Sequence, residues 1–126
     1  MKVLVDTSVW IDFFRDGKNS GKLDLLIDEN LIVTNDLILT ELIPYLRLKK
    51  QNKVIGLLTE ISKNEMNINW KQITDFQTLC LQKGYNGIGI PDLVIAQNAL
   101  QNDCGIFTLD NHFEMIASII NIKVFK

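Results

Sequence analysis

The stretch at residues 2–8 constrains the fold more than any other part of the sequence. It reads Lys-Val-Leu-Val-Asp-Thr-Ser, an apolar run that ends in a carboxylate and two hydroxyl residues. Such a run is typical of a strand buried on both faces, as in a parallel sheet. Thr7 or Ser8 is then expected to cap a helix that begins at Val9. Asp6 would lie at the carboxyl end of the strand, the edge at which open α/β sheets bind ligands.

Short apolar strands alternate with segments of helical period along the rest of the chain. Further strands are expected at residues 31–34, 105–109 and 122–125, with a candidate strand at 66–69. Helices are expected at residues 9–15, 23–29, 36–50, 54–61, 70–83, 92–101 and 111–119. This alternation predicts an α/β sandwich around a parallel sheet. Right-handed crossovers would bring the carboxyl ends of all strands to one edge.

The composition predicts a single domain over residues 1–126. The hydrophobic share of 47% excludes a disordered chain. No apolar run approaches the roughly 18 residues of a membrane span, and Asp6 interrupts the N-terminus too early for a signal peptide. We therefore expect a cytoplasmic protein without a membrane partner. Cys80 and Cys104 lie in apolar segments without CxxC spacing, which indicates buried free thiols rather than a zinc site.

Four carboxylates are expected at the same edge of the sheet. Asp6 and Asp110 each follow an apolar strand directly. Asp92 opens a helix after a loop, and Glu41 lies inside the helix after the second strand. Taken singly, each has a plainer role: a helix start for Asp92, an N-cap for Asp110 and a solvent-facing position for Glu41.

Carboxylates that converge must be protonated, paired with bases or bound to cations. Two unit charges about 4 Å apart repel by about 4 kcal/mol at an effective dielectric of about 20. Oxygen ligands without a Cys or His cluster favour Mg²⁺ or Mn²⁺, as one or two ions, and such sites commonly serve phosphodiester chemistry. The net charge of −2 does not exclude a phosphate-bearing partner. If four of the 15 acidic residues bind metal, 13 basic residues face 11 acidic ones.

Four motifs occur in a fixed order along essentially the whole chain. They are residues 6–9 (DTSV), 40–42 (TEL), 90–96 (IPDLVIA) and 108–113 (TLDNHF). Each motif is weak alone, but together they resemble the PIN domain. The closer resemblance is to the VapC-type toxin ribonucleases of bacterial and archaeal toxin–antitoxin pairs.

This resemblance implies a three-layer sandwich with a five-stranded, mostly parallel sheet, Mg²⁺-dependent cleavage of RNA and frequent homodimers. It also implies a cognate antitoxin whose tail blocks the acidic site, with a cationic side chain among the carboxylates. RNA products would carry a 5′ phosphate and a 3′ hydroxyl. The metal ligands would be Asp6, Glu41, Asp92 and Asp110. The hydroxyls of Thr7, Ser8 and Thr108 would line the site.

The sequence departs from the family pattern at two positions. Many members carry a second acid two residues beyond the last one, where this chain has His112. We expect His112 to be a surface or helix-capping residue rather than a general base. Pro44 lies inside the helix that carries Glu41 and is expected to kink it.

Basic residues near helix ends are candidates for contacts with RNA phosphates. The plainer interpretation is that they are solvated helix ends favoured by the macrodipole. The candidates are Arg15, Lys18, Arg47, Lys49, Lys50 and Lys53.

Other functions fit the sequence less well. A haloacid-dehalogenase-type phosphatase needs an Asp two residues after the first, where this chain has Ser8. A receiver domain needs a Lys at the end of a late strand, whereas Lys123 lies within one. A PIN-like module that binds RNA or a partner without cutting, and a housekeeping PIN nuclease, remain as alternatives.

Overall fold

A parallel sheet lies at the centre of the protein, between two groups of helices. The computed structural model describes residues 1–15, 17 and 20–125. Its strands are β1 (Val3–Val5), β2 (Ile32–Val33), β3 (Gly105–Phe107) and β4 (Val124–Phe125), in the order β2-β1-β3-β4. Every neighbouring pair of strands is parallel. The α/β fold with a parallel sheet flanked by helices is therefore as predicted.

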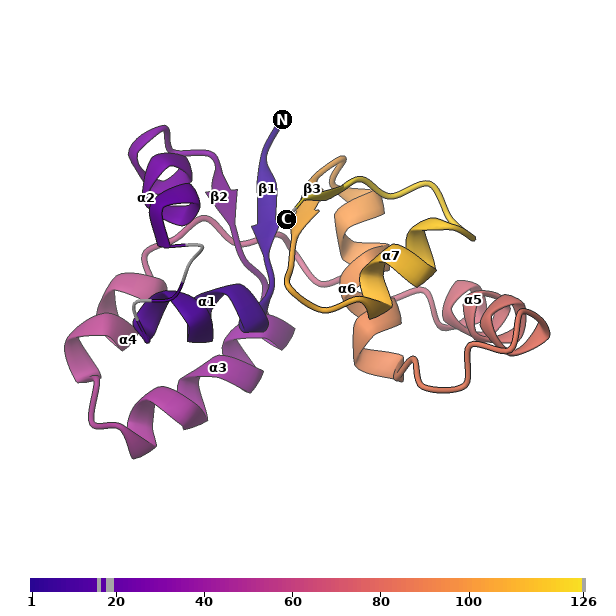
Figure 1. Cartoon of the computed structure of the whole chain (residues 1–126), viewed down its shortest axis with the longest axis horizontal. Coiled ribbons are helices and arrows are strands. Elements are labelled where there is room, and N and C mark those ends of the chain that lie inside the picture. The colour runs from indigo at the N-terminus through magenta and orange to yellow at the C-terminus, as the bar shows by residue number, and fades with distance from the viewer. Residues whose placement is uncertain (16, 18–19, 126) are drawn as a thin grey trace.

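The helices lie on two sides of the strands. Helices α1 (Thr7–Phe14), α2 (Ser20–Asp28), α3 (Asp36–Leu48) and α4 (Asn52–Leu58) gather beside β1 and β2 (Figure 1). Helices α5 (Trp70–Gln82), α6 (Ile90–Gln101) and α7 (His112–Ala117) gather on the side of β3. Within the described parts of the chain, no helix is long and apolar enough to cross a membrane.

The central strands are buried because they consist of apolar residues covered on both faces. Every residue of β1 and β3 is buried. Helix α6 is also enclosed, since Leu93 to Ala99 are all buried. A continuous buried run of this kind explains why α6 does not show the one-sided apolar stripe of a surface helix. Cys80 and Cys104 are buried and unpaired, as predicted.

The strand register brings two polar residues to the same edge of the sheet. Val5 pairs with Phe107 in the last step of the β1–β3 ladder. Asp6 and Thr108 therefore follow the last paired residues of adjacent strands. The backbone N–H of Asp6 donates to the carbonyl of Phe107 at 2.9 Å, which extends the ladder to the acid itself. Parallel pairing thus places Asp6 beside the residues that follow β3.

Within the described residues, the sheet has four strands rather than the expected five. Residues 66–69 form no strand, because side chains of α6 bind this part of the backbone instead. Gln97 accepts from the N–H of Asn69 and donates to its carbonyl, both at 3.0 Å. Gln101 donates to the carbonyl of Asn67 at 2.8 Å. The segment is therefore bound to a helix and not to a neighbouring strand.

Several helix boundaries also differ from prediction. Helix α1 begins at Thr7, with Asp6 as its N-cap residue, so Thr7 and Ser8 do not cap it. Helix α6 begins at Ile90, two residues before Asp92. Helix α3 continues past Pro44, as predicted, but ends at Leu48 rather than at residue 50. Its N-cap is Asn35, whose side chain accepts from the N–H of Ile38 at 2.9 Å.

Candidate metal centre

Asp6 lies at the carboxyl end of β1, where two hydroxyl groups hold it. Its side chain is nearly buried, with 6% of the residue exposed. Ser8 Oγ and Thr108 Oγ1 donate to Asp6 Oδ2 at 2.9 and 3.0 Å. Burial raises the pKa of Asp6, although these hydrogen bonds and those from the N–H groups of Thr7 and Ser8 oppose the rise. The carboxylate is therefore held in place at some cost in desolvation.

The same two hydroxyls connect β1 to the loop after β3. Ser8 Oγ accepts from the N–H of Leu109 at 3.1 Å. Thr108 Oγ1 accepts from the N–H of Asp110 at 3.0 Å. Each hydroxyl thus donates to Asp6 and accepts from the segment that carries Asp110. The positions of the two acids are fixed relative to each other by these shared groups.

Glu41 reaches the site from α3. Thr7 Oγ1 donates to Glu41 Oε1 at 3.3 Å. The pKa of Glu41 is raised first by burial and then by the negative charges of Asp6 and Asp92, and the Thr7 hydrogen bond opposes the rise. Glu41 is therefore close enough to both acids for their charges to act on it.

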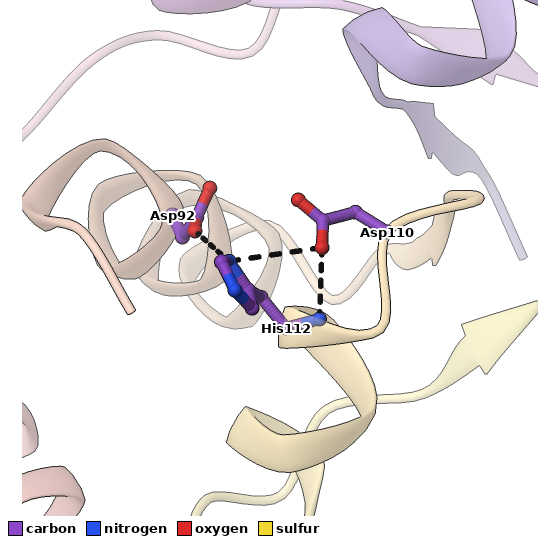
Figure 2. A group of neighbouring side chains, drawn as sticks. All are labelled: Asp92, Asp110 and His112. Atoms are coloured by element: carbon purple, nitrogen blue, oxygen red, sulfur yellow. Dashed lines mark hydrogen bonds and ion pairs between the residues drawn. The ribbon is translucent and has the colours of Figure 1, made fainter. Parts of the chain in front are cut away.

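Asp92 and Asp110 meet at the ring of His112. Nδ1 of His112 lies 3.0 Å from Asp92 Oδ2 and 3.7 Å from Asp110 Oδ1. Figure 2 shows the ring between the two carboxylates, with Asp92 on α6 and Asp110 on the loop before α7. Asp110 Oδ1 also accepts from the N–H of His112 at 2.9 Å, so Asp110 stabilises the start of α7 as well.

The structure places all four predicted acids near the same edge, but among the described residues only Asp92 and Asp110, with His112, form a cluster of possible ligand atoms. Asp6 and Glu41 are linked to them through hydroxyl groups and through charge. The predicted hydroxyls of Thr7, Ser8 and Thr108 are among these groups. His112 is the first residue of α7 and its side chain is 38% exposed, which fits a surface residue at a helix start, and its ring also contacts two of the acids. The sequence contained a signal for this residue, because it stands two positions after Asp110, at the position where the family resemblance implies a further acid.

The donor set suits a divalent cation. Ligand atoms of Asp92, Asp110 and His112 all lie within 4.8 Å of one another. Among the described residues, the groups that lower the pKa of Asp6 and Glu41 are hydroxyls and backbone amides, and no lysine or arginine is one of them. A buried Asp6 and a partly desolvated Glu41, both with raised pKa values, would be stabilised by a bound cation.

Five of the six basic candidates fall within the described residues, and Lys18 lies outside them. Arg15 and Lys49 line one hollow of about 330 Å³, where the Arg15 guanidinium lies 6.0 Å from the centre of the Tyr45 ring. Arg47 lines a second hollow. Lys50 and Lys53 are exposed. Arg15 follows α1 and Asp6 precedes it, so the helix separates them by about 13 Å along its axis at 1.5 Å per residue.

The α/β fold and the acids at the carboxyl edge of its parallel sheet together identify the family of this protein. The model of the PIN domain family matches residues 3–119, and the chain belongs to this family. No curated protein matches the chain in sequence.

Solved structures share the fold over nearly the full chain. VapBC2 from Rickettsia felis, bound to a DNA fragment from their promoter, has 21% identity over 100% of both chains and a TM-score of 0.75. FitAcB from Neisseria gonorrhoeae has 23% identity over 98% of this chain and 96% of that one, with a TM-score of 0.72. VapBC-1 from nontypeable Haemophilus influenzae has 21% identity over 100% of this chain and 98% of that one, with a TM-score of 0.73.

Proposed function

We propose that this protein is a divalent-metal-dependent endoribonuclease and the toxin of a toxin–antitoxin pair. The observation that carries the proposal is the group formed by Asp6, Glu41, Asp92 and Asp110, contributed by four separate segments of a PIN domain. Carboxylates that repel one another are stabilised by bound cations, and carboxylate-bound cations commonly serve phosphodiester chemistry. The four acids would hold Mg²⁺ or Mn²⁺, as one or two ions.

A bound cation would polarise the scissile phosphate and lower the pKa of an attacking water. The contribution of the protein is to fix the acids before the substrate arrives. Ser8 and Thr108 hold Asp6 through one oxygen, and Thr7 donates to Glu41. Because the same hydroxyls accept from the backbone after β3, Asp6 cannot shift without disturbing the loop that carries Asp110. Hydrolysis would leave a 5′ phosphate and a 3′ hydroxyl.

Cleavage of a mixed RNA pool tests the nuclease. Antitoxin-free protein would be assayed with Mg²⁺ and with Mn²⁺, with EDTA as a control, beside the variant Asp6→Asn. We expect cleavage that requires metal and disappears in Asp6→Asn. End-labelling of the products would identify the 5′ phosphate. Folded wild-type protein that cuts no RNA with either metal would contradict the proposal.

Metal binding distinguishes an active site from a non-catalytic module. A ligand that binds only the folded state raises its stability by RT ln(1 + [L]/Kd), which is about 2.7 kcal/mol at a concentration of about 100 Kd. We expect Mn²⁺ or Mg²⁺ to raise the Tm of the wild type and to raise that of Asp6→Asn much less. A protein with neither cleavage nor a metal-dependent Tm is a binding module.

The toxin assignment requires a protein partner. Its support is the likeness of the fold to VapBC complexes and an apolar hollow of about 360 Å³ between α1, α2 and α4. The hollow is lined by Trp10, Phe13, Phe14, Ile27, Ile32, Val54, Leu57, Leu58 and Ile61. Apolar side chains of an antitoxin would fill this hollow, because an exposed apolar surface gains most by leaving water.

The partner is tested with the product of a small gene next to this one. We expect the two proteins to purify together and the complex to be inactive on RNA. Ile27 and Leu57 are exposed at the hollow, so Ile27→Glu with Leu57→Glu should abolish the complex and preserve cleavage. A stable complex with the double variant would place the partner elsewhere, and a missing partner gene would favour a housekeeping nuclease.

Light scattering of the free protein would test the expected homodimer.

A further inference from the structure

We propose that Nδ1 of His112 is a nitrogen ligand in a cation site with Asp92 and Asp110, and that the protein consequently binds Mn²⁺ in preference to Mg²⁺. The inference rests on the proposed metal-dependent function and specifies the ion. It concerns the position at which this chain departs from the acidic pattern of its family.

The spacing of the three atoms fits one ion. Ligands about 2.1 Å from a metal lie about 3.0 Å apart when adjacent in an octahedron and about 4.2 Å apart when opposite. Nδ1 of His112 lies 3.0 Å from Asp92 Oδ2 and 3.7 Å from Asp110 Oδ1. All three ligand atoms lie within 4.8 Å of one another. Small side-chain adjustments would therefore place the three around a single cation.

The ring is held with Nδ1 toward the acids. The backbone N–H of His112 is tied to Asp110 Oδ1 at 2.9 Å, which fixes the residue at the start of α7 (Figure 2). The opposite ring nitrogen, Nε2, faces the loop before α6: a Cβ placed on Gly87 would lie 3.7 Å from it. The imidazole therefore lies between that loop and the two carboxylates, with one nitrogen available to an ion.

The mixed donor set determines the choice of ion. Mg²⁺ prefers oxygen ligands and keeps much of its water, whereas imidazole nitrogen suits transition metals. Mn²⁺ accepts carboxylate oxygen and also binds imidazole nitrogen. An imidazole nitrogen in place of an oxygen ligand should therefore weaken Mg²⁺ binding more than Mn²⁺ binding. The competing interpretation is that His112 only donates a hydrogen bond to Asp92 while the acids alone bind the ion.

Electron spin-echo spectroscopy of bound Mn²⁺ tests the ligand directly. The chain contains one histidine, so in protein without a tag any directly bound imidazole nitrogen must belong to His112. We expect nitrogen modulation in the wild type and none in His112→Asp, which restores an all-oxygen site. Calorimetry should show the ratio of Mn²⁺ to Mg²⁺ affinity falling by about 10-fold or more in that variant.

The outcomes separate the two proposals. Mn²⁺ bound without nitrogen modulation in the wild type would overturn the histidine ligand, and metal-dependent cleavage would still support the nuclease. Protein that binds no Mn²⁺ would overturn the histidine site, whereas the proposed metal dependence would fall only if RNA is not cleaved with Mg²⁺ either. If His112→Asp does not fold, the wild-type spectrum decides the question alone, and His112→Gln serves as the second variant.

Discussion

Asp6 lowers the stability of the metal-free fold while it supplies a carboxylate to the proposed metal site. Its pKa is raised because burial outweighs the hydrogen bonds from hydroxyls and backbone amides. In the absence of a cation, its charge therefore opposes folding. The sequence predicted this residue from its place at the end of a buried strand. The pairing of Ser8 with Thr108 could not be predicted, because it depends on a register between segments 100 residues apart.

Replacing Asp6 by Asn should abolish activity and stabilise the metal-free protein. The amide keeps the shape and an acceptor for Ser8 and Thr108 but carries no charge. We expect cleavage to fall by more than about 100-fold and the stability in EDTA to rise by about 0.5–2 kcal/mol. The matched control is Asp36→Asn, an exposed acid paired with Lys63, whose removal should not raise the Tm. A lower Tm for Asp6→Asn would show that the charge does not destabilise the fold.

The benefit of Asp6→Asn should depend on pH. The folded protein holds the protons of Asp6 and Glu41 to a higher pH than the unfolded chain does. Stability therefore falls as pH rises through the window above the ordinary carboxyl pKa of about 4, and the loss is complete above the raised values. In EDTA, the Tm difference between Asp6→Asn and wild type should be small near pH 4 and larger at pH 7. A difference that is constant over this range would contradict the raised pKa.

At the scale of the elements, side chains of α6 explain why the candidate strand at residues 66–69 does not form. Strand-like residues at 66–69 are bound by the side chains of Gln97 and Gln101, so the segment forms no strand. The local sequence of this segment cannot predict these hydrogen bonds, because the partner side chains lie about 30 residues further along the chain, on a helix. By contrast, the strands with continuous apolar runs and the longer helices were predictable, since their own burial pattern determines them.

Asn98 should be essential for the stability of this arrangement. It is nearly buried, accepts from Asn35 Nδ2 at 2.9 Å and donates to the carbonyl of Glu65 at 3.0 Å. Asn35 in turn caps α3, which carries Glu41. Asn98→Leu leaves these groups unpaired and should cost about 1–3 kcal/mol for each that stays buried. Denaturant titration measures the loss.

Gln101→Leu is the matched control, because the residue is exposed on the same helix and has one hydrogen bond to the backbone. Its effect should stay within about 0.5 kcal/mol. Equal effects of the two substitutions would show that the buried amide pair does not support α3.

At the scale of the whole molecule, the length of α1 separates the acids from Arg15 and Lys49. Each acid lies at or near the carboxyl edge, as the strand topology predicts. Arg15, Tyr45 and Lys49 lie together at the far end of α1. Their grouping could not be predicted, since it requires α1 and α3 to pack side by side. A substrate that reaches both regions must extend along α1, as a single strand of RNA could.

Arg15 and Lys49 should then contribute to RNA affinity through phosphates. The inactive variant Asp6→Asn would be titrated with labelled single-stranded RNA at increasing KCl, with and without Arg15→Gln and Lys49→Gln. Each phosphate contact that is lost should reduce the salt slope of binding by about 0.7. The control is Lys71→Gln with Lys83→Gln, which removes equal charge at the exposed ends of α5. If both pairs of substitutions weaken binding equally, RNA affinity depends only on net charge. If the substitutions of Arg15 and Lys49 change nothing, the bound RNA does not contact these two residues.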